Sequence, residues 1–174
     1  MADDLIELRL LRVLHPANPA ARPPEARFLA PALEYRFAIH RLSDGLRVGR
    51  IHLRVTDDPL ILRALGHAGY AVDEAHRRNG YAGRAVRLIA SLARLCGVSP
   101  LWVLIEPDNV ASRKTVERAG FNLVDTVDTL PEGMALGLGP RVCRYTIRHG
   151  RPRPPPTPAR RPKSFAARRR RDVL

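Results

Sequence analysis

The chain has 174 residues, of which 45% are apolar, so its length and composition predict one compact domain with a genuine core. Its formal net charge is +13, but nine basic residues and one acid lie between Arg151 and Leu174. The last 24 residues therefore carry +8 and the first 150 only +5. The net charge thus gives no ground for calling the folded part a nucleic-acid-binding domain.

Several other classes of protein are disfavoured. The two cysteines, Cys96 and Cys143, are too few for a disulfide framework, and both fall on apolar patterns, so we expect both to be buried. No Cys/His spacing suggests a metal site. The start, "MADDLIELRL", lacks the basic and apolar segments of a signal peptide, and no run is long enough to span a membrane. We therefore expect a cytoplasmic protein.

The first third of the chain predicts antiparallel strands. Residues 4–14 mix alternation with an apolar run and are interpreted as a first strand. Five prolines make 15–33 an irregular connection. Apolar and polar residues then alternate over 34–42 and 46–55, separated by "SDG", which is typical of a hairpin.

The middle of the chain predicts a strand, a loop, a helix and a strand in succession. Residues 66–73 are small and apolar, as in a central strand. From 82 to 96 the apolar residues recur at helical spacing, and the pattern stops at Gly97. The continuous apolar run at 100–107 is typical of a buried strand.

The last elements are a helix over 108–120 and strands over 121–130 and 141–149. Asp108 or Asn109 is the expected N-cap of the helix. The whole order of elements predicts an α/β protein.

One loop, "HRRNGYAGRAV", combines charge and flexibility directly before a helix. Main-chain N–H groups at a helix start lack intrahelical partners, and the helix dipole makes that end positive. Gly80, Ala82 and Gly83 carry no bulky side chain, and Arg77 and Arg78 add positive charge, so a phosphate could approach closely. The motifs of nucleoside-triphosphate and dinucleotide loops are both missing. A plain exposed basic turn remains an alternative reading of this loop alone.

Two blocks of sequence carry a resemblance to a known family. Arg77-x-x-Gly80-x-Ala82 resembles the acyl-CoA-binding signature of the GNAT N-acetyltransferases. "PDNVASRKTVERAGF" resembles the N-x-x-S…E-x-x-G-F block of members near the ribosomal-protein alanine acetyltransferases. The resemblance spans roughly residues 35–149, with the blocks in the same order and on the same kinds of element.

The resemblance implies a GNAT fold within a domain of residues 1–150. Its sheet is mixed and mostly antiparallel, with about six to seven strands and flanking helices. A central parallel pair, 66–73 and 100–107, splays apart at the acetyl-CoA cleft. Acetyl-CoA is the implied co-substrate, and no metal is implied.

The resemblance also implies which residues contact acetyl-CoA. The main-chain amides from Arg78 to Gly83 would hold the pyrophosphate, assisted by the side chains of Arg77 and Arg78. The N–H of Ala71 or Val72 would hold the thioester carbonyl, where a fixed donor also stabilises the charge that an attacking amine creates. The full set of cofactor-binding predictions is Ala71, Val72, Arg77, Arg78, Asn79, Gly80, Tyr81, Ala82, Gly83, Asn109 and Ser112.

Each candidate catalytic residue also has a structural interpretation. Many family members use a Tyr on the second helix for the leaving thiolate, but this chain has Glu117 there. Ser112 is the resemblance's candidate for that role, with a helix-capping serine as the alternative. His67 and Glu106 are candidate bases. Each also has a structural alternative, a packed histidine and an exposed carboxylate at a strand end.

The expected activity is acyl-CoA-dependent N-acetyl transfer to a primary amine by direct attack in a ternary complex. Neither 15–33 nor 130–140, the segments that select substrates in this fold, carries a recognisable code. A protein N-terminus, a small-molecule amine and an amino acid therefore all stay open as acceptors, and we allow for a homodimer. The alternative function is a non-catalytic acyl-CoA-sensing or nucleic-acid-binding module on the same scaffold.

The tail, residues 151–174, contains six prolines and few apolar residues, so we expect it not to fold alone. A solvated extension is the simpler interpretation. The functional one is an electrostatic tether to RNA or an acidic partner, weakened by salt.

Overall fold

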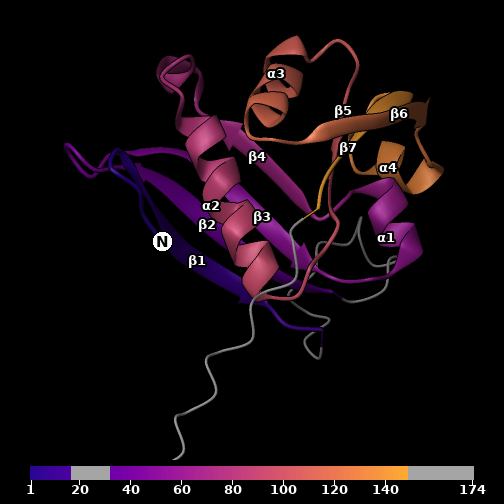
Figure 1. Cartoon of the computed structure of the whole chain (residues 1–174), viewed down its shortest axis with the longest axis horizontal. Coiled ribbons are helices and arrows are strands. Elements are labelled where there is room, and N and C mark those ends of the chain that lie inside the picture. The colour runs from indigo at the N-terminus through magenta and orange to yellow at the C-terminus, as the bar shows by residue number, and fades with distance from the viewer. Residues whose placement is uncertain (17–31, 149–174) are drawn as a thin grey trace, which may run out of the picture.

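A computed structural model describes residues 1–16 and 32–148, and its strands form two antiparallel sheets (Figure 1). The first sheet holds four strands in chain order: β1 (Ile6–Leu14), β2 (Leu33–Arg41), β3 (Arg47–Val55) and β4 (Ala68–Val72). The second sheet holds β5 (Leu101–Ile105), β7 (Arg141–Ile147) and β6 (Asn122–Asp128), in that spatial order. The predicted α/β class is confirmed.

Two long helices lie where the sequence predicts them. They are α2 (Tyr81–Leu95) and α3 (Val110–Arg118), and Asn109 is the N-cap of α3. Gly97 and Gly120, which follow the two helices, both have positive φ, as a helix end of this kind requires.

Short helices appear where the sequence predicts none. They are α1 (Pro59–Ala64), the 3₁₀ helix η3 (Glu74–His76) and α4 (Pro131–Ala135), which lies between the strands predicted at 121–130 and 141–149. Pro59 and Pro131 stand in the first turns of α1 and α4, where a missing N–H costs nothing. Helices of three to six residues are too short to leave a periodic pattern, so only the tertiary structure reveals them.

The main core lies between the first sheet and α2, which covers one face of it (Figure 1). Alternate residues of β2 and β3 face α2, because successive strand residues point to opposite faces. These buried residues include Phe37, Ile39, Ile51 and Leu53 from the strands and Ala85, Ile89 and Ala93 from the helix. Cys143 is buried as predicted, whereas Cys96, at the end of α2, is only half-buried, and that expectation was wrong.

The two sheets meet at the beginning of β4 and β5. The N–H of His67 donates to the carbonyl oxygen of Trp102 over 2.8 Å. Beyond this bond each strand pairs only within its own sheet, and the two ribbons diverge in Figure 1. The predicted single sheet is therefore divided into two at this pair, because diverging strands soon exceed the N···O distance of a main-chain hydrogen bond.

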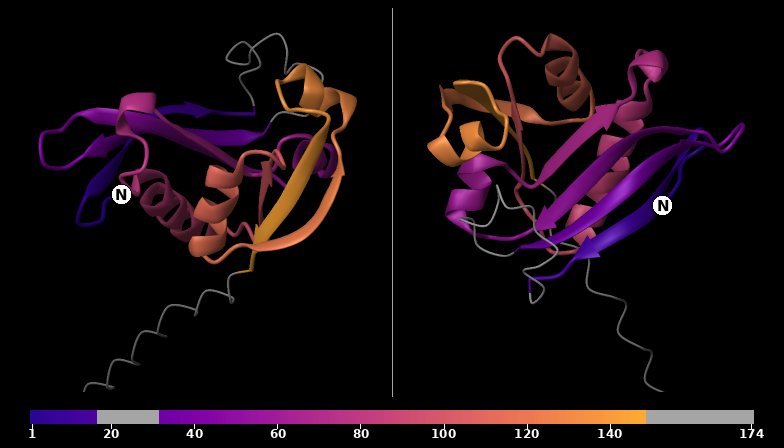
Figure 2. Two further views of the ribbon diagram at one scale, coloured as in Figure 1. Left: turned by 90° about the horizontal axis from the view of Figure 1, so that it is seen from above. Right: turned by 180° about the vertical axis from the view of Figure 1, so that it is seen from behind.

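The two sides of the first sheet are covered differently. The left view of Figure 2 shows α2 and α3 on one side of the sheet and α4 on the other. The right view shows the face of the first sheet that α2 does not cover, which we call the back face. None of the helices that the structure describes is both long and apolar enough to cross a membrane.

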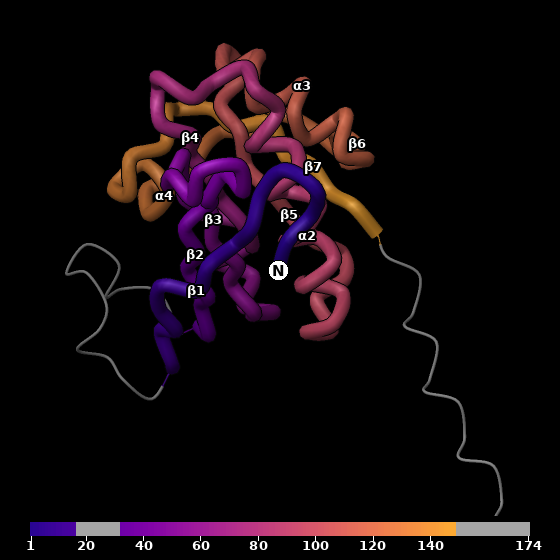
Figure 3. The backbone as a smooth tube through the Cα atoms, turned by 90° about the vertical axis from the view of Figure 1, so that its left-hand side faces the viewer, coloured from indigo at the N-terminus to yellow at the C-terminus, as the bar shows by residue number. Residues whose placement is uncertain are grey.

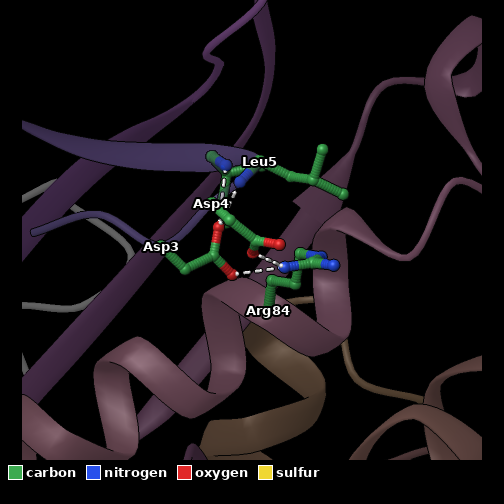
Figure 4. A network of polar contacts seen from close by, with 5 residues as sticks. Asp3, Asp4, Leu5 and Arg84 are labelled. Atoms are coloured by element: carbon green, nitrogen blue, oxygen red, sulfur yellow. Dashed lines mark hydrogen bonds and ion pairs between the residues drawn. The ribbon is translucent and has the colours of Figure 1, made fainter.

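The N-terminal residues run beside α2 (Figure 3) and are tied to its first turn (Figure 4). Arg84 donates to Asp3 over 3.0 Å and also pairs with Asp4. Asp3 in turn accepts from the N–H groups of Leu5 and Ile6. Burial opposes these contacts, but together they lower the pKa of Asp3, so its carboxylate stays charged and the attachment persists at neutral pH.

Candidate active site

The loop between β4 and α2 has left-handed backbone conformations at two residues. Gly80 is the N-cap of α2 with φ of 76°, and Arg78 has φ of 64°. A Cβ atom on Gly80 would meet no heavy atom within 4 Å, so the glycine is required by its dihedral angle and not by a neighbour. The loop thus leaves open space in front of the helix.

Six consecutive main-chain N–H groups at this end of α2 lack a hydrogen-bond partner within the described residues. Those of residues 78–83 donate no hydrogen bond within the described chain, and the first bond of α2 runs from the N–H of Arg84 to Gly80 oxygen at 3.2 Å. Unpartnered amides at a helix start, together with the helix dipole, favour a bound anion. This is the strongest candidate binding element in the structure.

The polar side chains of the loop divide between bracing it and facing solvent. The Asn79 side-chain amide donates to the carbonyl oxygens of His76 and Arg77, each over 3.1 Å, so it holds the loop's shape. The Arg77 Nε donates to Val72 oxygen over 3.2 Å. Arg78 is exposed, so its charge is available to a ligand.

The first residues of α2 contribute mainly their backbone. The Tyr81 side chain is only 7% exposed and lies in the core, so its main-chain N–H is what it offers to a ligand. Ala82 and Gly83 are half-buried. A Cβ on Gly83 would lie 3.9 Å from the methyl group of Thr115, so α2 and α3 approach each other closely there.

The geometry of β4 distinguishes between the two predicted carbonyl-binding residues. Main-chain groups of a strand alternate between its two edges. The N–H of Asp73 donates to Val48 on β3, and Arg54 of β3 donates to the oxygen of His67, so odd-numbered residues of β4 bond toward β3. Ala71 belongs to that set. Val72 presents its N–H at the opposite edge, toward β5, and is therefore the residue able to bind a carbonyl there.

The first turn of α3 lies across from β4. Asn109 caps the helix through its side-chain oxygen, which accepts from the N–H of Ser112 at 3.1 Å. The Ser112 hydroxyl makes no hydrogen bond within the described chain, so capping is not its function. Tyr70 reaches from β4 and donates its hydroxyl to the carbonyl oxygen of Ser112 at 3.2 Å.

Tyr70 is the residue at this place that the sequence analysis did not single out. Burial raises the pKa of its phenol, against the lowering effect of contacts with Ser112 and Thr115, so the hydroxyl keeps its proton at neutral pH. Strand alternation could have placed Tyr70 on the α2 face. Its contact with a helix 42 residues later could not be predicted.

Glu117, which stands in place of the family's tyrosine, has a structural partner. Its carboxylate accepts the Tyr145 hydroxyl over 2.7 Å, and Arg113 donates to the same hydroxyl oxygen over 3.0 Å. This chain of contacts ties α3 to β7. Glu117 therefore holds the helix in place and is not directed at the β4 edge.

Glu106 follows β5 directly and faces the loop after α4. One carboxylate oxygen accepts the N–H of Gly139 over 2.8 Å. The other oxygen makes no hydrogen bond within the described residues. Glu106 is half-buried, so it combines a fixed position with a free proton acceptor.

His67, the other candidate base, has both ring nitrogens occupied. Nδ1 accepts the N–H of Trp102 at 3.0 Å, and Nε2 lies 3.1 Å from the carbonyl oxygen of Thr56, so the ring proton is on Nε2. Burial lowers the pKa of His67, and the ring is neutral. With no lone pair left to accept a proton, the ring is suited to joining β4, β5 and the segment after β3.

A pocket of about 450 Å³ lies beside His67 and Trp102, where β4 and β5 begin. It is therefore at the opposite end of these strands from the loop that precedes α2. Its walls come mostly from the end of β3 and the segments that follow β3 and α2, together with Leu62 of α1, and they include Val55, Cys96, Val98 and Pro100. The pocket does not coincide with the predicted acetyl-CoA site.

Comparison with known proteins identifies the family. The family model for the acetyltransferase (GNAT) domain matches residues 14–122, more than half of the chain. The chain therefore belongs to the GNAT acetyltransferase family, as its two sequence blocks predict. It is an acyl-CoA-dependent N-acetyltransferase with acetyl-CoA as co-substrate. No curated protein matches the sequence.

Solved structures share the fold at low sequence identity. A putative ribosomal-protein-serine acetyltransferase from Vibrio cholerae aligns with a TM-score of 0.56 and 14% identity, covering 85% of this chain and 96% of the other. A ribosomal-protein alanine acetyltransferase from Vibrio fischeri gives 0.58 and 15%, covering 85% and 95%. The spermidine N-acetyltransferase of Vibrio cholerae, solved with CoA and spermine, gives 0.57 and 12%, covering 84% and 96%.

Proposed function

We propose that the loop before α2 binds the pyrophosphate of acetyl-CoA and that acetyl transfer takes place between β4, β5 and the start of α3. The observation that carries this proposal is the row of six unpartnered amides at residues 78–83, with Arg78 exposed beside them. Their position after β4 agrees with the motif that led to the family. The phosphates supply the charge that these amides and the helix dipole favour.

The reaction forms one bond and breaks one. The amine nitrogen of the acceptor forms a C–N bond to the acyl carbon, and the C–S bond of the thioester breaks. Starting from an ammonium group, the acceptor loses two protons. One is taken up by the departing thiolate, and one is released to solvent. The chain must therefore provide a proton acceptor, a stabiliser of the carbonyl oxygen and a proton donor for sulfur.

Three positions fit these needs. Val72 has its N–H at the edge facing β5, which suits the carbonyl oxygen. Glu106 has a free carboxylate oxygen, which suits the acceptor's proton, directly or through water. The Ser112 hydroxyl, with Tyr70 beside it, suits the thiolate. We assign His67 to the structure of the strand pair, because both of its nitrogens are bonded.

The acceptor remains a primary amine of a small molecule or a protein N-terminus. The similar structures include one of each kind, a putative ribosomal-protein-serine acetyltransferase and a spermidine N-acetyltransferase. We also keep the prediction of one catalytic domain, 1–150, followed by the basic tail, 151–174, as a tether to RNA or an acidic partner. The tail lies outside the described residues, as does most of the Pro-rich connection 15–33. A homodimer is still allowed.

We propose the cytoplasm as the location. Both cysteines are free thiols, one buried and one half-buried, which fits a reducing compartment. Burial raises the pKa of Cys96, so this thiol stays protonated and is a poor nucleophile at neutral pH.

The binding site is tested by titrating acetyl-CoA calorimetrically into the full chain and into two variants, Gly80→Asp and Gly80→Asn. The two side chains have the same shape and the same strain at φ of 76°, and open space surrounds the position, so only the charge differs. We expect Gly80→Asp to weaken binding about tenfold or more relative to Gly80→Asn, because the carboxylate repels the phosphates. Equal affinities in two folded variants would contradict the assignment.

The alternative, a non-catalytic acyl-CoA-sensing or nucleic-acid-binding module, predicts a different result. Such a chain would bind acetyl-CoA without releasing CoA over a broad panel of amines. Replacing Glu106 by Gln separates the two. An enzyme would lose turnover while keeping acetyl-CoA affinity, whereas a sensing module would show no change in either quantity.

A further inference from the structure

The back face of the first sheet carries charge where its other face carries the core. Strand register places Glu34, Arg36 and Ala38 of β2 opposite Arg54, His52 and Arg50 of β3. On β4, Gly69 lies opposite His52 and Ala71 opposite Arg50. On this face, β4 therefore presents only a glycine and an alanine just before Val72, whose N–H we assign to the acyl carbonyl.

Arg50 is an unpaired cation of this face, on the strand next to β4. Its partners in register on both neighbouring strands are alanines, Ala38 and Ala71, so neither offers a carboxylate. Its side chain is exposed and makes no ion pair or hydrogen bond within residues 1–16 and 32–148. Ala71 directly precedes Val72, whose N–H we assign to the acyl carbonyl. Arg50 therefore stands beside the site of acetyl transfer.

His52 supplies an unsatisfied polar group beside Arg50. Its Nε2 atom is buried and has no hydrogen-bond partner. The ring lies over Gly69, where a Cβ atom would come within 2.8 Å of Cε1 and 3.1 Å of Nε2, so only glycine fits beneath it. A buried polar atom without a partner is costly and rare, so His52 Nε2 is a donor or acceptor that a bound group could satisfy.

The charges around His52 favour an anion. Glu34 is the carboxylate of this group, and it is already held by Arg36 at 2.6 Å and Arg54 at 2.8 Å. Burial lowers the pKa of His52 to about 3, helped by the charges of Arg54, Arg36 and Arg50 and opposed by Glu34. The ring is thus neutral, and three guanidinium groups face one carboxylate, leaving an excess of two positive charges.

We propose that Arg50 and His52 form an anion subsite beside the acyl-transfer centre, and that it binds a carboxylate of the acceptor. A guanidinium and an imidazole N–H together offer the donors that the two oxygen atoms of a carboxylate accept. The acceptor is then an amine with a carboxylate nearby, and polyamines are excluded by charge. This inference rests on the proposed function, because it takes the β4 edge to be the place of transfer.

The carboxylate can belong to a free amino acid or to an acidic side chain near a protein N-terminus, and two pairs of acceptors distinguish these sources. The first pair of acceptors is L-alanine and L-alaninamide, which differ in the α-carboxylate of a free amino acid. The second pair is the amidated tripeptides Ala-Asp-Ala and Ala-Asn-Ala, which differ in an acidic side chain near a protein N-terminus. The rate of CoA thiol release gives kcat/KM for each acceptor with the full chain. Calorimetry in the presence of CoA gives the affinity of each acceptor without turnover.

We expect the charged member of one pair to be favoured about tenfold or more, as for a charge-assisted hydrogen bond. Arg50→Gln should remove that preference and leave the neutral member unchanged. Arg94→Gln, which removes an equally exposed charge from the last turn of α2, should keep it. Because Arg50 is exposed and unpaired, the variant should unfold at the same temperature as the parent chain.

Equal values for both members of both pairs, in kcat/KM and in affinity, would overturn the subsite. So would a preference that survives in Arg50→Gln. Failure of the proposed function looks different, because it would show as no thiol release and no acetyl-CoA binding. In that case the acceptor affinities still decide whether the back face selects a carboxylate.

Discussion

The two ends of β4 and β5 differ in how completely their polar groups are satisfied. The closed end lies at His67 and Trp102. There the His67 ring and one main-chain hydrogen bond join both strands to the segment after β3. The open end lies at Val72 and the loop before α2. There the strands separate, and six consecutive main-chain amides have no hydrogen-bond partner within the described chain. Satisfied groups hold a fold together, whereas unsatisfied groups at an exposed loop are available to a ligand.

The largest effect is expected from breaking the closed end. His67→Ala removes the partners of the Trp102 N–H and the Thr56 oxygen and leaves a cavity, so we expect it to lower the free energy of unfolding by about 2–4 kcal/mol. Urea denaturation measures this. His40→Ala is the matched control, because that ring makes one exposed contact, with Gly45, and should cost under about 1 kcal/mol. Equal losses would show that the closed end is not a structural joint.

A second effect concerns His52, which lies over β4 between the two ends. Its native pKa, lowered from the ordinary value of 6.5 to about 3, means that below pH 6.5 the unfolded chain takes up a proton that the native chain does not. The contribution of the neutral His52 ring to the free energy of unfolding is therefore fully present above pH 6.5 and is lost as the pH falls below that value. By pH 5 the loss from this one group is about 2 kcal/mol.

The measurement is urea denaturation from pH 7.5 to 5 on the parent chain and on His52→Gln. The variant lacks the titrating ring, so its stability should fall less steeply with decreasing pH. Parallel curves for the two proteins would show that His52 is protonated normally in the native state. Bound carboxylate should shift the native pKa upward and flatten the parent's curve.

A third effect sharpens the chemistry of the open end. If Ser112 donates to the thiolate, Ser112→Ala should lower kcat about tenfold while the affinity for acetyl-CoA is kept. Tyr70→Phe removes the hydroxyl that contacts Ser112 oxygen and is the matched comparison. A larger loss in Tyr70→Phe than in Ser112→Ala would transfer the role of proton donor to the tyrosine.

The smallest effect concerns the attachment of the N-terminus to the open end (Figure 4). Asp3 and Asp4 neutralise Arg84 in the first turn of α2, beside the amides that we assign to phosphate. Asp3→Asn combined with Asp4→Asn should free Arg84 and strengthen acetyl-CoA binding about twofold at low salt, with the gain disappearing at high salt. Calorimetry at two salt concentrations measures this, and a gain unaffected by salt would point to a cause other than charge.

Local patterns predicted the main elements well. Alternation over 34–42 and 46–55 gave β2 and β3, and helical spacing that stopped at Gly97 gave α2. These signals depend on residues close in sequence, so they can be recognised before any folding. The short helices α1 and α4 lack such a signal, and the sequence analysis predicts no helix at either place.

The candidate site was predicted less evenly. The loop before α2 is continuous in sequence, so its motif could be recognised there, and its binding of phosphate stays a prediction. Glu106, Ser112 and His67 were named, but their surroundings come from other elements: Gly139 for Glu106, and Trp102 for His67. The sequence offered the N–H of Ala71 or Val72 for the thioester carbonyl, and only the strand pairing favours Val72.

The sequence by itself determined the class of fold, the family and the position of the loop that we propose to bind phosphate, because periodicity and a contiguous motif are local properties. The tertiary structure alone decided which groups are satisfied. Tyr70 meets Ser112 across 42 residues, and His67 meets Trp102 across 35. Likewise, only strand register puts Arg50 between two alanines and His52 over Gly69. Hydrogen bonds and burial join residues that are distant along the chain, so their pattern exists only once the chain has folded.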